Sequence, residues 1–349
     1  MNQVAPVLAF GAAVLFGLSA PAAKLLVGAV DPWLLAGLLY LGSGLGLVLV
    51  RLGQRALGAG RTEARVTAGD VPWLFGAIVA GGMVGPVLLM FALARGPASE
   101  AALLLNLEGV LTAVVAWVVF REHFHARIVV AMGAITAGSV TLAWSGAADT
   151  VLPWPAVLVV AACLAWAIDN NLTRVVSSAD PVHTAALKGL VAGTVNVAIA
   201  LGRGVAWPPW DVALGAAVVG LLGYGTSLVL FVHALRHLGA GRTAAYFSTA
   251  PFIGAVVAVV ALDEPLGRQL ALGAGLMAFG VWLHLTEDHE HEHGHEALEH
   301  EHGHRHDMHH QHDHSPGTPT AEPHTHWHTH APLRHRHPHY PDLHHRHRH

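Results

Sequence analysis

The sequence predicts an all-α membrane protein with ten transmembrane helices and a disordered histidine-rich C-terminal tail. Three observations lead to this fold class. Only 12% of the 349 residues are charged and 53% are hydrophobic, whereas soluble proteins carry about 25% charged residues. Apolar stretches of about 20 residues, the length of a helix that crosses a bilayer, recur along residues 1–286. Histidine is then concentrated in residues 287–349.

Turn residues such as Asp31-Pro32 and Gly96-Pro97 separate the apolar stretches. The first stretch is too long for the core of a signal peptide, so we expect it to be retained as the first span. Cys163 lies in an apolar stretch and, as the single cysteine, has no partner for an internal disulfide. The predicted spans cover residues 4–28, 32–51, 72–94, 97–120, 127–145, 154–174, 182–202, 211–235, 240–262 and 268–286.

The loop arginines predict how the spans are oriented. With the N-terminus inside, nine arginines fall in cytoplasmic loops and three in outer loops, which is the bias that orients membrane proteins. The cytoplasmic arginines are Arg51, Arg55, Arg61, Arg65, Arg121, Arg127, Arg174, Arg236 and Arg242. An even number of spans returns the C-terminus to the cytoplasm. We therefore expect both termini inside, in the inner membrane of a bacterial-type cell.

The two halves of the apolar region resemble each other. With a shift of 142 residues, Glu122 aligns with Glu264 and Gly138 aligns with Gly280. Each half contains five spans, and an odd number makes the second half enter the membrane from the opposite side, as in secondary transporters with inverted repeats. The competing interpretation is that two sets of Ala-, Val-, Leu- and Gly-rich helices match by composition alone. The predicted domains are residues 1–145, 146–286 and, for the tail, 287–349.

A family resemblance lies in the fourth span and the loop that follows it. Residues 101–110 (AALLLNLEGV) resemble the fourth-helix motif of EamA-domain proteins in the drug/metabolite transporter superfamily. Further matching places are Arg121-Glu122, Ala250-Pro251-Phe252, Asp263-Glu264 and the segment from Phe16-Gly17 to Lys24. The resemblance covers about residues 5–285. It implies a secondary transporter that works by alternating access without ATP.

The chain departs from the family pattern beside its central glutamate. Gly109 stands where the family commonly has proline after that residue, Glu108, and a glycine permits a bend less rigidly than proline. Ala250 holds the place in the second half that corresponds to Glu108. Any role of Glu108 is therefore not duplicated.

Glu108 lies near the centre of its predicted span and is the first candidate for a proton-binding or cation-binding carboxylate. Ionisable residues inside membrane helices are rare and usually face an interior cavity, and burial favours the uncharged carboxyl, which suits reversible protonation. Thr112 shares the helix face of Glu108, and Asn106 is close in sequence. The competing interpretation is a neutral Glu108 that joins two helices by a hydrogen bond.

A second polar segment interrupts the sixth span. Asp169 and Thr173 are four residues apart and share a helix face, with Asn170 next to Asp169. This segment is a candidate lining for the inner half of a cavity. The alternative is an intrahelical or interhelical pair between Asp169 and an arginine close to the cytoplasmic interface, such as Arg174.

Several other ionisable residues leave two interpretations open. Lys24 and Lys188 either contact an anionic substrate group or extend toward the headgroups. His233 is either a ligand of the pathway or a structural residue, and Glu122 and Glu264 are interpreted as structural loop contacts. The predicted transport pathway consists of Glu108, Asn106, Thr112, Asp169, Asn170, Lys24 and His233.

The tail carries 23 of the 29 histidines, interleaved with Glu, Asp, Gly and Pro. It lacks an apolar face and is predicted to be disordered without metal. Neutral imidazoles in a flexible chain suit Zn, Ni, Co or Cu. Two alternatives are a metal buffer or sensor unrelated to the cargo, and a tail that responds to pH near about 6.5. The predicted ligands are His289, His291, His293, His295, His302, His304, His306, His324, His326, His328 and His330.

Together these observations predict a secondary transporter, an exporter, of a small metabolite or a divalent metal ion. The alternative from another class is a membrane-anchored metal sensor or metal store without transport. No catalytic residues are predicted, because the spans lack paired carboxylates, a His-Glu metalloprotease pattern and a nucleophile motif. We expect no required cofactor and no nucleic-acid partner. The expected surroundings are a lipid bilayer, with the chain as a monomer or homodimer.

Overall fold

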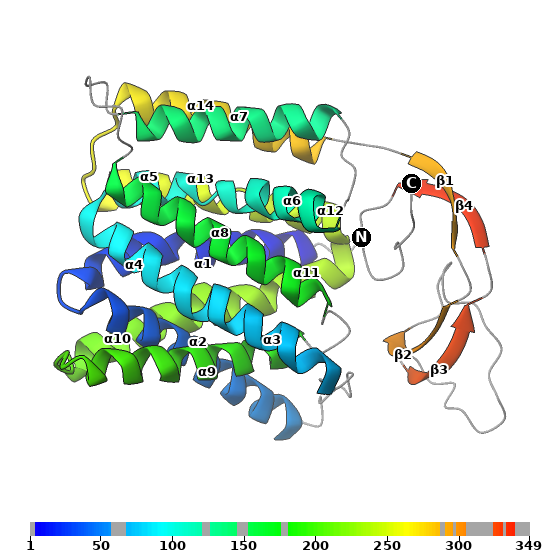
Figure 1. Cartoon of the computed structure of the whole chain (residues 1–349), viewed down its shortest axis with the longest axis horizontal. Coiled ribbons are helices and arrows are strands. Elements are labelled where there is room, and N and C mark those ends of the chain that lie inside the picture. Colours follow the sequence, from blue (N-terminus) through cyan, green and yellow to red (C-terminus); the bar gives the residue numbers. More distant parts are fainter. Residues whose placement is uncertain are drawn as a thin grey trace.

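The structure, a computed structural model, describes residues 4–56, 68–120, 126–144, 153–175, 181–286, 290–295, 298–304, 324–330 and 333–338. Its first 286 residues form a bundle of helices that run roughly along one common direction (Figure 1). The helices are α1 (Val4–Val27), α2 (Pro32–Ala56), η1 (Ala68–Asp70), α3 (Val71–Ala77), η2 (Ile78–Val84), α4 (Gly85–Arg95), α5 (Ala98–Leu104), α6 (Leu107–Phe120), α7 (Ala126–Ala143), α8 (Trp154–Val175), α9 (Pro181–Gly202), α10 (Trp210–Gly220), η3 (Leu221–Thr226), α11 (Ser227–Leu238), α12 (Ala240–Phe247), α13 (Ala250–Ala261) and α14 (Arg268–Leu285).

Nine stretches of the described chain are long and apolar enough to cross a membrane. They correspond to the first nine predicted spans; for example, Trp154–Arg174 coincides with the predicted sixth span. The tenth predicted span is α14, which has 18 residues and is not among the nine. Its end residues Arg268, Gln269 and His284 explain this, because they lower the mean hydropathy of a short helix.

Glycines allow α2 to approach α9 and α10 closely. A Cβ atom on Gly189 of α9 would lie 2.8 Å from the backbone nitrogen of Gly44, and one on Gly42 would lie 2.2 Å from the carbonyl oxygen of Ala217 in α10. Contacts this short leave no room for a side chain. Small residues at helix contacts provide the close backbone approach that holds membrane helices together.

Two of the predicted spans are discontinuous at equivalent positions. The fourth span is divided into α5 and α6 at residues 105–106, and the ninth is divided into α12 and α13 at residues 248–249. With the shift of 142 residues, Asn106 corresponds to Ser248. The backbone is therefore interrupted at the same point in both halves, which supports the internal repeat.

Two other spans contain π-helical segments, also at equivalent positions. Segment η2 joins α3 to α4, and segment η3 joins α10 to α11. The same shift aligns Gly81 of η2 with Gly223 of η3. Short π-helical segments inside α-helices are frequent at functional sites, so these two segments are candidate functional positions in the middle of the bundle.

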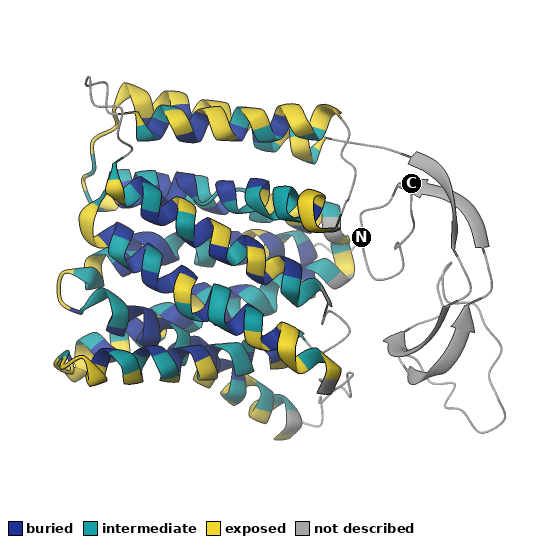
Figure 2. Cartoon of the chain, in the orientation of Figure 1, coloured by how far each residue is buried: buried dark blue, intermediate teal, exposed yellow. Residues whose placement is uncertain are grey.

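Helices α7 and α14 form a pair at one edge of the bundle, at the top of Figure 1. They pack closely, because a Cβ atom on Gly138 would lie 2.7 Å from the carbonyl oxygen of Gly273. Figure 2 shows exposed residues along both helices and more buried residues in the middle of the bundle. Exposed side chains on this pair include Val129, Val130 and Phe279, and such an apolar surface suits contact with lipid.

Part of the tail forms strands instead of the predicted disorder. The strands are β1 (Glu290–His295), β2 (Leu298–His304), β3 (His324–His330) and β4 (Leu333–Pro338). β1 pairs antiparallel with β4, and β2 with β3. Histidine alternates with other residues there, and a period of two is that of an extended strand. The register places His300, His302 and His304 opposite His328, His326 and His324.

Candidate functional site

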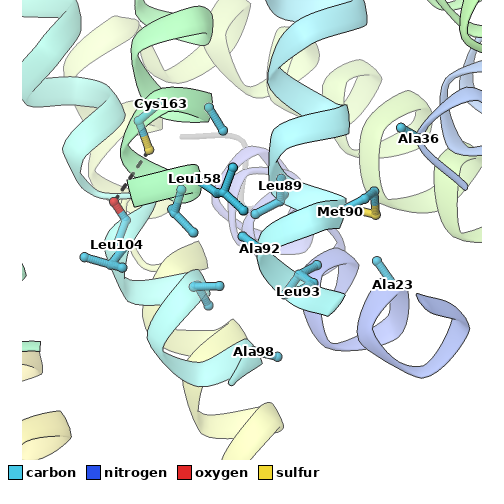
Figure 3. Close-up of a cluster of buried hydrophobic side chains, with 14 of the residues drawn as sticks. Ala23, Ala36, Leu89, Met90, Ala92, Leu93, Ala98, Leu104, Leu158 and Cys163 are labelled. Atoms are coloured by element: carbon cyan, nitrogen blue, oxygen red, sulfur yellow. Dashed lines mark hydrogen bonds between the residues drawn. The ribbon is translucent and has the colours of Figure 1, made fainter. Parts of the chain in front are cut away.

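The break between α5 and α6 is stabilised by Asn106. Its Nδ2 donates to the carbonyl oxygen of Leu103 at 2.8 Å, and its backbone N–H donates to the same oxygen at 3.0 Å. The end of α5 also presents the carbonyl oxygen of Leu104, which accepts a hydrogen bond from Cys163 Sγ of α8 at 3.6 Å (Figure 3). Cys163 is fully buried.

The break between α12 and α13 uses the same interaction with a different residue. Ser248 Oγ donates to the carbonyl oxygen of Ala245 at 2.8 Å, and these two residues correspond to Asn106 and Leu103. Thr249 Oγ1 donates to the carbonyl oxygen three residues before it at 2.6 Å. In both halves a short polar side chain therefore bonds a carbonyl oxygen at the point where the helix is interrupted.

A small, partly open pocket of about 10 Å³, room for about one water molecule, lies next to both breaks. α1 contributes Phe16, Gly17 and Ala20, the first break Ala102 and Leu105, and the second break Ala250 and Pro251. The lining is apolar. The charged groups of the site therefore lie outside this lining.

Glu108 begins α6 and contacts α8. Asn170 Nδ2 donates to Glu108 Oε1 at 2.9 Å and to Thr112 Oγ1 at 3.3 Å. The neighbouring Asn171 is buried and donates to the carbonyl oxygen of Thr112 at 3.1 Å. The structure thus brings together three predicted pathway residues, Glu108, Thr112 and Asn170, from helices that are far apart in sequence.

Asp169 lies beside this cluster but faces α9. Lys188 Nζ donates to Asp169 Oδ1 at 2.6 Å and also forms an ion pair with Oδ2. Thr173 Oγ1 donates to Oδ1 at 2.9 Å. The ion-pair partner of Asp169 is therefore Lys188, whereas the sequence suggested Arg174. The physical reason is packing, because α8 and α9 both pack against η2 and the long Lys188 side chain reaches Asp169 from α9.

The carboxylate of Asp169 packs directly against the π-helical segment η2. A Cβ atom on Gly81 would lie 1.8 Å from Asp169 Oδ2, so only glycine fits there. The carbonyl oxygen of Gly81 accepts two hydrogen bonds, from Tyr40 OH at 2.8 Å and from Trp166 Nε1 at 2.9 Å. The Tyr40 ring in turn lies 5.7 Å from the ring of Tyr224 in η3. The two π-helical segments are thereby connected through one pair of tyrosines.

Two charged residues satisfy helix ends. Lys24 Nζ donates to the carbonyl oxygens of Leu93 at 2.6 Å and Gly96 at 2.8 Å, at the end of α4. Glu264 accepts hydrogen bonds from the backbone N–H groups of Ala98 at 2.7 Å and Ser99 at 2.8 Å, at the start of α5. These contacts match the structural role predicted for Glu264. They give Lys24 bound partners that the sequence did not suggest.

The remaining predicted residues lie elsewhere. His233 is on the exposed side of α11, and the ring of His237 contacts its carbonyl oxygen. Glu122, His289 and His306 lie outside the described residues. Among the residues that the structure describes, no group of three or more His, Cys, Asp and Glu could hold a metal ion.

Sequence reasoning missed the groups that connect the site to neighbouring helices. Asn196 of α9 is buried, accepts a hydrogen bond from Trp33 Nε1 at 3.3 Å, and donates to the carbonyl oxygen of Gly82 in η2 at 3.5 Å. Tyr40 and Trp166 bind the same segment. The available signal was a polar or amphipathic residue in the middle of an otherwise apolar span.

A bundle of apolar spans, with interrupted helices and ionisable groups buried between them, defines a multi-pass membrane protein of the transporter type. Residues 3–144 and 153–286 match the model of the EamA-like transporter family, and the chain belongs to this family. An uncharacterized transporter from Methanothermobacter thermautotrophicus is 27% identical over 285 residues, which is 78% of this chain and 83% of that protein.

The fold also occurs in a solved structure described only as a crystal structure of a protein. The TM-score is 0.60 at 19% sequence identity, and the match covers 81% of this chain and 97% of that chain. At this level of identity the likeness concerns the fold alone. The family resemblance stated from the sequence is confirmed by the family match.

Proposed function

We propose that this protein is an alternating-access secondary transporter that exports a small metabolite or a divalent metal ion. The observation that carries the proposal is the pair of helix breaks, at residues 105–106 and 248–249, which adjoin one pocket. Non-helical backbone at membrane depth occurs where it lines a cavity or is buried in protein. Transporters place their substrate sites at such discontinuous helices, near the interface of two repeats.

The two repeats are part of this proposal. Two family matches, one for each half of the chain, support five-helix repeats in residues 1–145 and 146–286. Equivalent positions of the breaks and of the π-helical segments support the same division. An inverted arrangement follows from five spans in each half. The arginine distribution supports a cytoplasmic location of both termini.

Glu108 serves as the carboxylate that meets the cargo or a proton. It lies in the first turn after a helix break and has Asn170 as its partner. The first turn of a helix favours a negative charge, while the apolar surroundings favour the protonated form. These opposing influences suit a group that changes its protonation state during a transport cycle.

The tail binds a divalent transition metal and collects it at the cytoplasmic face. Support comes from its histidine content and from the register of β2 and β3, which places three histidines opposite three others. Directly opposed residues of an antiparallel pair are close neighbours. The tail is an accessory in this proposal, and the helices carry out transport.

Flux into and out of proteoliposomes tests the proposal. We would compare the intact chain, a truncation after Glu287 that keeps every described helix, and Glu108→Gln, with Zn²⁺, Ni²⁺ and Co²⁺ offered in turn. For a metal cargo we expect flux that Glu108→Gln reduces tenfold or more and that truncation only weakens. Metal bound by the tail without any flux would assign the cargo to the small metabolites. Loss of all function on truncation, with Glu108→Gln unchanged, would favour a metal sensor instead.

A further inference from the structure

The chain contains only two lysines, Lys24 and Lys188, against 17 arginines. Both lysines lie within membrane-spanning helices, α1 and α9, while the loops use arginine. The two cations differ in one relevant respect. A guanidinium stays charged in proteins, whereas a buried ammonium loses its proton readily when it is deprived of a counter-ion. A lysine in a buried ion pair can therefore release its proton when the counter-ion is removed, whereas an arginine cannot.

The Lys188–Asp169 pair is enclosed by three helices. The side chain of Asp169 is 6% exposed and that of Lys188 is 18% exposed. α8 supplies Asp169 and Thr173, α9 supplies Lys188, and η2 presents the bare backbone of Gly81. Both carboxylate oxygens of Asp169 are bound to the ammonium, so among the described residues Asp169 is the counter-ion in direct contact with Lys188.

Two other titratable groups act on the pair from neighbouring helices. Glu108 on α6 interacts electrostatically with both Asp169 and Lys188, and Tyr40 on α2 interacts with Asp169. The segment η2 carries no titratable residue. Asp169 and Asn170 are consecutive on α8, and Asn170 donates a hydrogen bond to Glu108.

From this geometry, and relying on the transport function proposed above, we propose that Asp169 is a binding site for a cationic cargo and that Lys188 is its displaceable counter-ion. An arriving cation, either a metal ion or an organic ammonium, takes the place of the Lys188 ammonium on the Asp169 carboxylate. The N–H bond of the uncompensated ammonium then breaks, its electron pair stays on Nζ, and the proton passes to water. Departure of the cation reverses each change, so one proton leaves for each cation that enters. The exchange is electroneutral for an organic ammonium and adds one net positive charge to the site for a divalent metal ion.

A cargo-independent measurement tests the central step. Full-length protein in lipid nanodiscs is labelled with ¹³C at the lysine ε-carbons, which yields two lysine signals that report the charge of each amine. Asp169→Asn removes the counter-ion without changing the shape of the side chain, and so imitates a carboxylate neutralised by a cation. We expect the Lys188 signal to change from ammonium to neutral amine at pH 7, while the Lys24 signal stays at its wild-type position. A Lys188 signal that remains that of an ammonium would overturn the proposal.

A flux measurement tests the consequence. Proteoliposomes with an internal pH dye receive Zn²⁺, Ni²⁺, Co²⁺ or methylammonium, and proton movement is recorded with cation movement. Lys188→Arg preserves the ion pair with Asp169, but the arginine side chain does not release its proton. We expect it to abolish cation-driven proton movement, whereas Asp31→Asn, the same chemical change as Asp169→Asn at the start of α2, leaves it at the wild-type level. Unchanged proton movement in Lys188→Arg would overturn the coupling site while leaving transport intact. Absence of flux in the wild type would count against the proposed transport of these cations, and the lysine signals would still decide the charge step.

Discussion

The two π-helical segments have the same backbone and different chemistry. In η2, Gly81 packs against the ion-paired carboxylate of Asp169. In η3, the equivalent Gly223 packs against Ser19 of α1. A Cβ atom added to Gly223 would lie 2.7 Å from the Cβ atom of Ser19. The breaks differ in the same way, since Glu108 has Ala250 as its counterpart. The duplicated backbone provides two places where helices can bend. Among the described residues, the buried ion pair adjoins only η2, so the two segments differ in charge.

The largest effect is expected from removing one member of the ion pair. Asp169→Ala leaves Lys188 without its counter-ion, and breaking a buried pair lowers the free energy of unfolding by about 3–5 kcal/mol. The counterpart Ser19→Ala loses one hydrogen bond, to the carbonyl oxygen of Phe16, and should lose about 1 kcal/mol. Titration with SDS in mixed micelles measures both. The double variant with Lys188→Ala should recover much of the loss, and no recovery would show that the two charges do not interact.

The next effect is expected at the equivalent glycines. Gly81→Ala places a methyl group on the Asp169 carboxylate, and overpacking of this kind lowers stability by about 1–3 kcal/mol. Gly223→Ala should be milder because its neighbour is a small neutral residue. Adding Ser19→Gly to Gly223→Ala should restore stability by removing the contacting carbon atom. Equal losses for both alanine variants, measured by thermal unfolding, would mean that the carboxylate adjusts freely.

A smaller effect is expected at the start of α5. Glu264→Ala removes the acceptor of two backbone N–H groups, and the loss of a helix cap lowers the free energy of unfolding by about 1–2 kcal/mol. Glu100→Gln is a matched control on α5 itself. Glu100 and Glu264 repel each other, so neutralising Glu100 should leave stability unchanged or raise it slightly. A Glu264→Ala variant as stable as the wild type would show that water replaces the cap.

The smallest effect on stability is expected at Glu108. A glutamine keeps the oxygen that accepts from Asn170 Nδ2, so Glu108→Gln should change the free energy of unfolding by less than about 1 kcal/mol. Glu108→Gln is expected to reduce flux in proteoliposomes, as stated above. A large loss of stability in SDS titration would instead support the interpretation of Glu108 as a residue that only joins α6 to α8.

The spans could be predicted from the sequence because hydropathy and turn residues act locally. Trp154–Arg174 was located to the residue, and the family was recognised from the motif at residues 101–110 and the further matching places in both halves. The breaks and π-helical segments were not predicted, since Asn106 and Ser248 are ordinary residues until their side chains bond a carbonyl oxygen. The partner of Asp169 was also missed. Pairing with Lys188 depends on the packing of both α8 and α9 against η2, which no local pattern records.

The cap on α5 has a consequence for synthesis. Glu264 is separated from Ala98 by 166 positions along the chain. At about 5–20 residues per second, a ribosome needs roughly 8–33 s to reach Glu264 after it has made Ala98. Throughout that interval the first turn of α5 lacks its carboxylate. The first half of the protein is therefore completed only when the last loop between helices has been made, and the two halves reach their final form together.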